Sequence, residues 1–165
     1  MKATWAFHRL LRPEYRWVDS AEADAESTSG VLAKSERELE ATLSLDGLVE
    51  IRDVLWPLAW RFCLEPISML LAGAQPEWRY RCFDQPKSYT LRISGHEVRV
   101  LEERGKEVGF PARALWPALM DAGARVLAWT ERDRGAADPN VATLRPSLER
   151  AEVTLREYGL LAAQS

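Results

Sequence analysis

Three arginines at alternating positions of a predicted β-sheet are the residues best suited to bind an anion. Apolar and polar residues alternate from residue 78 to residue 110, which is typical of strands with one buried face. The register expected for these strands places Arg79 opposite Arg92, and Arg92 opposite Arg99, on the polar face. Guanidinium groups bind carboxylate and phosphate groups well, so the sequence predicts an anion-binding row.

The same row has a second, structural interpretation. Like charges that face each other across strands destabilise a sheet unless acidic side chains lie between them. Acids are available on the same strands and in the last predicted helix: Glu97, Glu107, Glu149, Glu152 and Glu157. If these acids pair with the arginines, the row stabilises the sheet and needs no ligand.

A tryptophan and four acidic residues near the N-terminus form the second candidate site, for a protein partner. They are Trp17, Asp19, Glu22, Asp24 and Glu26. The segment from Ser20 to Gly30 has small and polar residues without an apolar period, which predicts an acidic surface loop. An acidic surface accelerates association with a basic protein, and an exposed tryptophan is a common centre of binding energy. The alternative is a solvated loop that binds no partner.

Seven tryptophans are a high number for a chain of 165 residues. Those in the predicted helices and in the main predicted sheet are expected to be buried, because aromatic side chains contribute much of the apolar surface of protein cores. Trp5 and Trp17 lie near the N-terminus, and we expect these two to be exposed.

Residues that would indicate catalysis are missing from the sequence pattern. The two histidines, His8 and His96, stand far apart without metal-ligand spacing, and Cys63 and Cys82 form no CxxC pair. Cys82 falls on the apolar face of its predicted strand, where a buried thiol is inert. The chain also lacks a phosphate-binding glycine loop and a GxSxG elbow. We therefore expect no catalytic residue, metal or cofactor.

Composition and charge favour a single globular domain over residues 1–165. The chain has 22 basic and 25 acidic residues, a net charge of -3 and 47% hydrophobic residues. A net acidic chain without a wide basic patch is a poor nucleic-acid binder. The longest apolar stretch, from Val54 to Gly73, contains Arg61 and Glu65, which argues against a membrane span. Without an apolar leader or a disulfide framework, a cytoplasmic location is expected.

Local patterns predict the β-elements. The segment Trp5–Leu11 is predicted to form a first strand. A hairpin over residues 39–51 is expected to turn at residues 45–47, so that Leu43 faces Val49 and Ala41 faces Ile51. A four-strand meander follows, with turns at residues 84–87, 95–96 and 103–105. Two of these turns predict the pairs Ile93 with Val98, Leu91 with Val100, Val100 with Val108, and Val98 with Phe110.

Helical patterns occupy the rest of the chain. We expect helices over residues 54–64 and 66–74 with a corner between them, a long helix over residues 111–132, and a last helix over residues 144–158. Pro117 and Gly123 should bend or interrupt the long helix, and Gly159 should end the last one. The predicted fold is α+β: an antiparallel meander of about four strands plus an N-terminal hairpin, packed in one layer against three or four helices.

These features together predict a non-enzymatic cytoplasmic protein that binds another protein with a basic surface. In size, acidity and lack of catalytic motifs the chain resembles, as a type, the immunity proteins with which bacteria neutralise a cognate toxin. The alternative is a domain that binds a small ligand or anion through the arginine row, and an enzyme of unfamiliar type is the third hypothesis. The sequence does not fix the oligomeric state.

Overall fold

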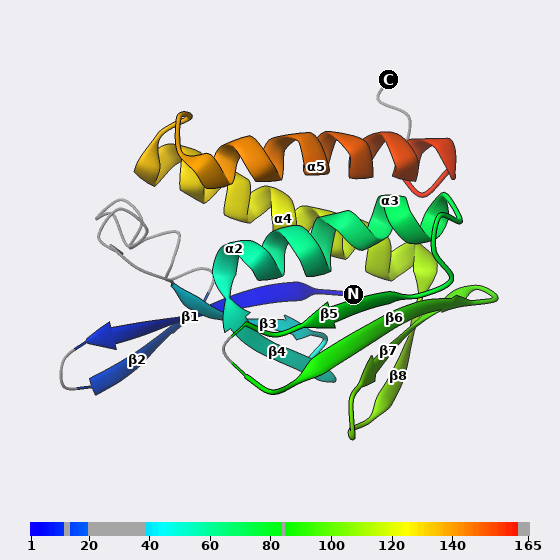
Figure 1. The fold of residues 1–165 in the computed structure, drawn as a ribbon, viewed down its shortest axis with the longest axis horizontal. Coiled ribbons are helices and arrows are strands. Elements are labelled where there is room, and N and C mark those ends of the chain that lie inside the picture. Colours follow the sequence, from blue (N-terminus) through cyan, green and yellow to red (C-terminus); the bar gives the residue numbers. More distant parts are fainter. Residues whose placement is uncertain (12–13, 20–38, 84, 162–165) are drawn as a thin grey trace.

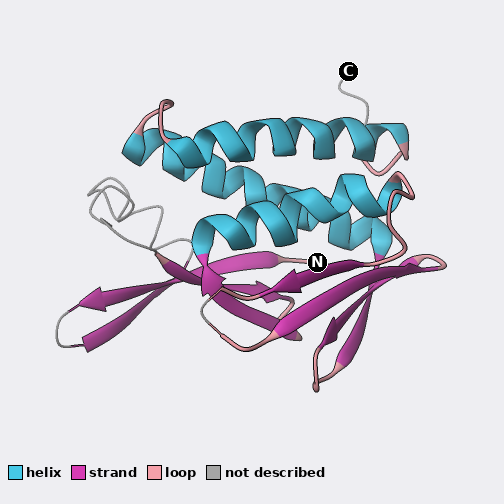
Figure 2. Cartoon of the chain, in the orientation of Figure 1, coloured by secondary structure: helices cyan, strands magenta, loops and turns pink. Residues whose placement is uncertain are grey.

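A computed structural model describes residues 1–11, 14–19, 39–83 and 85–161, and its fold is α+β, as the sequence predicts. Its strands form two antiparallel sheets of four strands each (Figures 1 and 2). The first sheet has the order β2-β1-β3-β4, with β1 (Ala3–Leu11), β2 (Glu14–Asp19), β3 (Glu40–Leu45) and β4 (Val49–Val54). The second sheet has the order β5-β6-β7-β8, with β5 (Trp78–Arg81), β6 (Ser88–Ser94), β7 (Glu97–Glu102) and β8 (Glu107–Pro111).

The helices all lie on one side of the two sheets (Figure 1). Three short segments follow β4 directly: α2 (Leu55–Pro57), η1 (Leu58–Leu64) and α3 (Glu65–Leu71). After β8 come α4 (Ala112–Arg134) and α5 (Pro139–Glu157). Helix α5 lies farthest from the sheets and packs on α4 and α3 (Figure 1). Side chains from both sheets and from all the long helices share one apolar core.

The predicted corner near residue 64 is wrong, because the chain stays helical from Leu55 to Leu71. Segment η1 is a π-helix, and the N–H group of Glu65 donates to the carbonyl of Trp60, five residues earlier. In that pattern the carbonyl of Arg61 would accept from residue 66, which is a proline without an N–H group. The indole of Trp78 donates to this carbonyl at 2.7 Å instead. The helix therefore continues through Pro66.

The hairpin of β3 and β4 has the predicted buried face but a different register. Leu43 pairs with Ile51 and Leu45 with Val49, so the turn comprises residues 46–48 rather than 45–47. Leu45 is fully buried as a strand residue. Burial of its apolar side chain stabilises the protein more than an exposed position in the turn would. Asp46 and Gly47 take the left-handed conformation in this loop, with φ values of 51° and 69°.

The register of the second sheet confirms five predicted pairs, among them Arg92 opposite Arg99, and corrects one. Ile93 pairs with Val98, Leu91 with Val100, Val100 with Val108, and Val98 with Phe110. Arg79, however, lies opposite Thr90 and not opposite Arg92. The N–H group of Cys82 donates to the carbonyl of Lys87, so each residue of β5 lies opposite a residue of β6 two positions earlier in the sequence than predicted.

The two long helices differ from their predictions in detail. Helix α4 runs through Pro117 and Gly123 without interruption. A Cβ atom on Gly123 would lie 2.5 Å from Leu64, so this glycine permits close helix packing. Helix α5 begins five residues before the expected start, because Asp138 caps it and Pro139 occupies its first turn. Gly159, with a φ of 66°, follows the helix end as predicted.

The expectation that Trp5 is exposed is wrong. Its side chain is almost completely buried beneath α4, and its indole donates to the carbonyl of Ala122 at 3.0 Å. The alternation of β1 places Ala3, Trp5 and Phe7 on the face that meets the helices, and Phe7 packs edge-on against Trp129. The pairing of β1 with β3 completes this face, which sequence alternation of one short strand could not reveal.

Replacing Trp78 with phenylalanine tests how the π-helix is held. We expect Trp78→Phe to lower the free energy of unfolding by about 1–3 kcal/mol, because it leaves the partly buried carbonyl of Arg61 without a donor. In a Pro66→Ala background the loss should shrink, since residue 66 then supplies an N–H group. Chemical denaturation of the four proteins measures this difference, and an equal loss in both backgrounds would show that the indole bond is unimportant.

Candidate functional site

The predicted partner-binding residues begin on an arm of the molecule. The hairpin of β1 and β2 extends past the ends of the helices (Figure 1). Strand β2 is the edge strand of the first sheet and, in the part of the chain that the structure describes, pairs with β1 alone. In its register Trp17 lies opposite His8, and Asp19 lies opposite Ala6. Trp17 and Asp19 therefore lie on the outer strand of the first sheet.

The remaining acids of that candidate, Glu22, Asp24 and Glu26, lie outside the described residues, as does the whole predicted loop from Ser20 to Gly30. Asp19 is the last residue of β2, so these acids follow the edge strand directly in the sequence. The prediction that this segment binds a basic partner stays a prediction.

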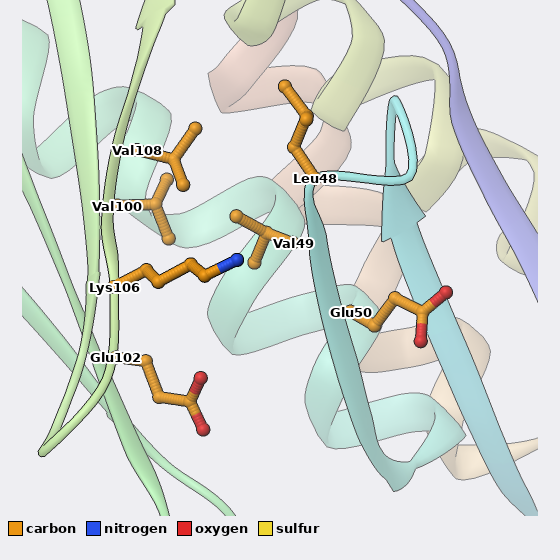
Figure 3. A pocket seen from close by; sticks show the side chains of 7 residues that line it. All are labelled: Leu48, Val49, Glu50, Val100, Glu102, Lys106 and Val108. Carbon is orange, nitrogen blue, oxygen red and sulfur yellow. The ribbon is translucent and has the colours of Figure 1, made fainter.

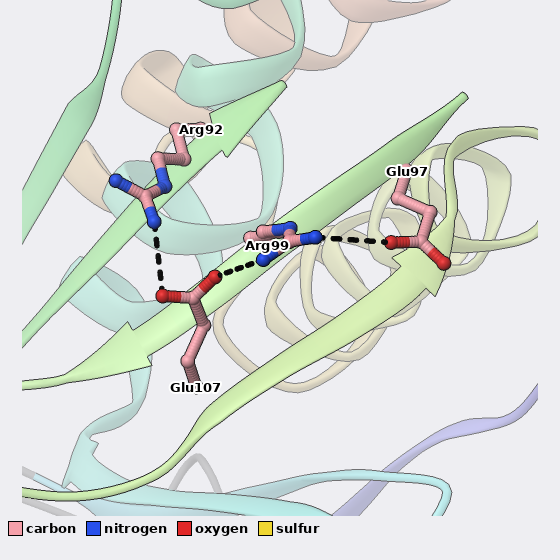
Figure 4. A network of polar contacts seen from close by, with 4 residues as sticks. All are labelled: Arg92, Glu97, Arg99 and Glu107. Atoms are coloured by element: carbon pink, nitrogen blue, oxygen red, sulfur yellow. Dashed lines mark hydrogen bonds and ion pairs between the residues drawn. The ribbon is translucent and has the colours of Figure 1, made fainter. Parts of the chain in front are cut away.

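The arginine row lies on the face of the second sheet that the helices do not cover, and it forms a network with two glutamates (Figure 4). Glu107 accepts from Arg92 at 2.9 Å through one carboxylate oxygen and from Arg99 at 2.7 Å through the other. Arg99 also lies 3.9 Å from Glu97. Both guanidinium groups are thus paired with one carboxylate of the protein itself, that of Glu107.

The third arginine of the row, Arg79, lies outside this network and is more exposed. Arg79 lies 3.7 Å from Glu77, and its side chain is 71% exposed. Gly109 lies opposite Arg99, where a Cβ atom would come within 2.9 Å of Glu97, so the glycine leaves room for the network. Arg92 and Arg99 lower the pKa of Glu107 below its ordinary value by hydrogen bonds and charge. This arrangement is the acid-paired one that the sequence left as the alternative.

A buried aspartate is the polar site that sequence reasoning missed. Asp53 is completely buried in β4, where it accepts from the Tyr80 hydroxyl at 2.5 Å and from the Phe83 N–H group at 2.9 Å. It lies two residues after Ile51, and four after Val49, on the apolar face of the strand. This position in the alternation could have been recognised in the sequence, because a charged residue on the buried face of a strand requires partners.

The groups around Asp53 are held neutral. Burial, followed by the hydrogen bond to Asp53, raises the pKa of Tyr80. Burial also raises the pKa of the Cys63 thiol. Cys82 is buried, as its place on the apolar face predicted. Neutral, enclosed groups of this kind are suited to holding two sheets together and poorly suited to reacting with a substrate.

A small pocket lies between the turn of β3 and β4 and the hairpin of β7 and β8 (Figure 3). Its lining combines apolar side chains with charged ones: Leu48, Val49, Glu50, Val100, Glu102, Lys106 and Val108. Its volume of about 60 Å³ accommodates a few water molecules. Cofactor sites usually measure several hundred Å³.

Among the residues that the structure describes, no group of three or more histidine, cysteine or acidic side chains could hold a metal ion. No helix in the same part of the chain is long and apolar enough to cross a membrane. Comparison of the chain with models of known families, with curated proteins and with solved structures finds no match. The candidate sites therefore rest on the geometry of this chain.

Removing the carboxylate of Asp53 should destabilise the protein strongly. We expect Asp53→Ala to lower the free energy of unfolding by about 3 kcal/mol, because it leaves the Tyr80 hydroxyl and the Phe83 N–H group buried without an acceptor. The exposed residue Glu50 on the same strand gives a control, and Glu50→Ala should change stability by less than about 0.5 kcal/mol. A loss from Asp53→Ala as small as that of the control would contradict the role given to Asp53.

The glutamate network makes a prediction for pH dependence. The folded protein lowers the pKa of Glu107, so the ion pairs stabilise above the ordinary carboxyl pKa and their contribution is lost as the pH falls through the lowered one. Carbon NMR of the Glu107 carboxyl should show this low pKa. Arg92→Ala and Arg99→Ala should each raise it, and a pKa unchanged in both variants would show that the pairs do not persist in solution.

Proposed function

We propose that this chain is a non-enzymatic cytoplasmic protein that binds another protein with a basic surface. The observation that carries the proposal is the position of Trp17 and Asp19 on β2, the outer strand of an arm that extends past the helices. A strand with one unpaired edge is a ready surface for a second protein. Neutralisation of a cognate toxin, as by a bacterial immunity protein, is the specific role that we propose for such binding.

Charge supports a basic partner. Between residues 14 and 26 the sequence has five acidic residues and one arginine. Acidic side chains concentrated in one segment attract a basic surface over distances near the Debye length, about 8–10 Å at physiological salt. The expected consequence is fast, salt-dependent association.

Two features support a role outside catalysis. The buried polar cluster around Asp53 is enclosed, and the thiol of Cys63 is held in its neutral form. The pocket between the sheets is too small for a cofactor. Recognition through an outer strand needs neither a deep pocket nor a reactive group.

Charge reversal in the acidic segment tests this proposal. The tagged protein is used to isolate its partner from native cells at low salt, and the partner is then purified for binding kinetics. The combined variant Glu22→Lys, Asp24→Lys and Glu26→Lys should slow association by about tenfold or more and flatten its salt dependence. A partner that binds the variant at the same rate would contradict the proposal.

A matched control distinguishes the effect of charge in this segment from the effect of net charge. Glu77, Glu149 and Glu157 are exposed acids on other parts of the molecule, and their combined replacement by lysine changes the net charge by the same amount. That control should retain most of the association rate. Recovery of the tagged protein alone, at low and high salt, would overturn the partner-binding function as a whole.

Anion binding by the arginine row is the second candidate function. It is favoured by the way that Arg92 and Arg99 hold the two oxygens of one carboxylate, which a ligand carboxylate could replace (Figure 4). If so, citrate at constant ionic strength should raise the melting temperature of the wild type but not of Arg92→Ala. An equal effect of citrate on both proteins would remove this candidate.

A further inference from the structure

We infer that the outer edge of β2, which pairs with no further strand among the described residues, binds its partner by strand addition, in which an extended basic segment of the partner pairs with the backbone of Tyr15, Trp17 and Asp19. This inference rests on the proposed function and specifies how the partner is held. In such complexes main-chain hydrogen bonds provide affinity, and flanking side chains provide selectivity.

The alternation of hydrogen bonds in the first sheet identifies the free groups of β2. Residues of an antiparallel strand direct their N–H and carbonyl groups alternately to one neighbour and to the other. The N–H group of Asp46 donates to the carbonyl of Lys2 at 3.0 Å, which shows that the even residues of β1 bond to β3. Its odd residues therefore bond to β2, at Glu14, Arg16 and Val18. The backbone groups of Tyr15, Trp17 and Asp19 are left at the outer edge.

The opposite edge of the same sheet is covered. By the same alternation, the outer carbonyls of β4 include those of Glu50 and Arg52. The hydroxyl of Tyr89 donates to the carbonyl of Glu50 at 3.2 Å, and the amide of Gln85 donates to that of Arg52 at 2.7 Å. The side chains of Tyr89 in β6 and of Gln85 in the connection between β5 and β6 thus occupy the β4 edge, and β2 is the other edge strand of the sheet that the structure describes.

Both edges of the second sheet carry features that discourage strand pairing. The bond from Cys82 to Lys87 places the outer backbone groups of β5 at Arg79 and Arg81, and charged side chains protect an edge strand. The bond from Glu102 to Lys106 places the outer groups of β8 at Glu107, Gly109 and Pro111. Proline has no N–H group to offer.

Strand β2 has the opposite character. Two of its three outer positions are aromatic residues, Tyr15 and Trp17, which favour strands. A second copy of the chain is a poor occupant, because Asp19 and the acids that follow it would repel their own counterparts. A basic extended segment of a partner satisfies both the open backbone and the local charge.

The test uses a defined probe, an eight-residue peptide of alternating lysine and threonine with blocked ends. Amide NMR of the full-length chain should show saturable shifts centred on Tyr15, Trp17 and Asp19. The same peptide methylated at every backbone nitrogen keeps its charge but cannot pair, and it should bind about tenfold more weakly or worse. Equal binding of both peptides, or no saturable shift at these three amides, would overturn strand addition.

A pair of variants tests the same edge from the protein side. Tyr15→Pro removes an outward N–H group without removing a bond to β1, and Tyr15→Ala removes the same side chain but keeps the N–H group. The proline variant should bind the peptide about fivefold more weakly than the alanine variant, with an unchanged pairing of β1 and β2 in the NMR spectrum. Equal affinities would overturn strand addition. The proposed function would still stand if charge reversal at Glu22, Asp24 and Glu26 slowed association with the purified partner.

Discussion

The buried carboxylate of Asp53 is the interaction on which the arrangement of the two sheets depends. It lies in the last strand of the first sheet and accepts from the hydroxyl of Tyr80 in the second sheet and from the backbone N–H group of Phe83, two residues after β5. Tyr89 and Gln85 add two bonds along the same strand. Because these contacts cover β4, β2 is the edge of the described sheet at which we propose strand addition, and the proposed binding residues begin there.

The same principle, that a buried polar group must have a partner, explains much of the remaining fold. The tryptophan indoles of Trp5, Trp56 and Trp78 donate to a carbonyl, a hydroxyl and a carbonyl of the helices. These bonds direct large apolar side chains to single positions, so they fix how the sheets meet the helices. On the exposed face of the second sheet, two glutamates pair with Arg92 and Arg99, so the like charges there do not oppose folding.

The sequence predicted what depends on local chemistry. Turn residues and alternation gave the α+β class and the pairing of β6, β7 and β8, because glycine and apolar periods there agree with one register. The sequence-based predictions were wrong where the structure depends on contacts between residues far apart in the chain. The carbonyl of Arg61 needs Trp78, the register of β3 depends on the burial of Leu45, and Trp5 is covered by α4. The position of Asp53 on the buried face could have been predicted from the alternation of its strand, but its hydrogen-bond partners could not have been predicted.

Photo-crosslinking in native cells tests the central claim that this chain binds a protein through its arm. A photoreactive amino acid is placed at Trp17, and in parallel at Arg99 on the second sheet and at Val153, which is exposed on α5. We expect one discrete crosslinked protein from position 17 and none from the other two positions. A crosslink from position 99 or 153 without one from position 17 would contradict it.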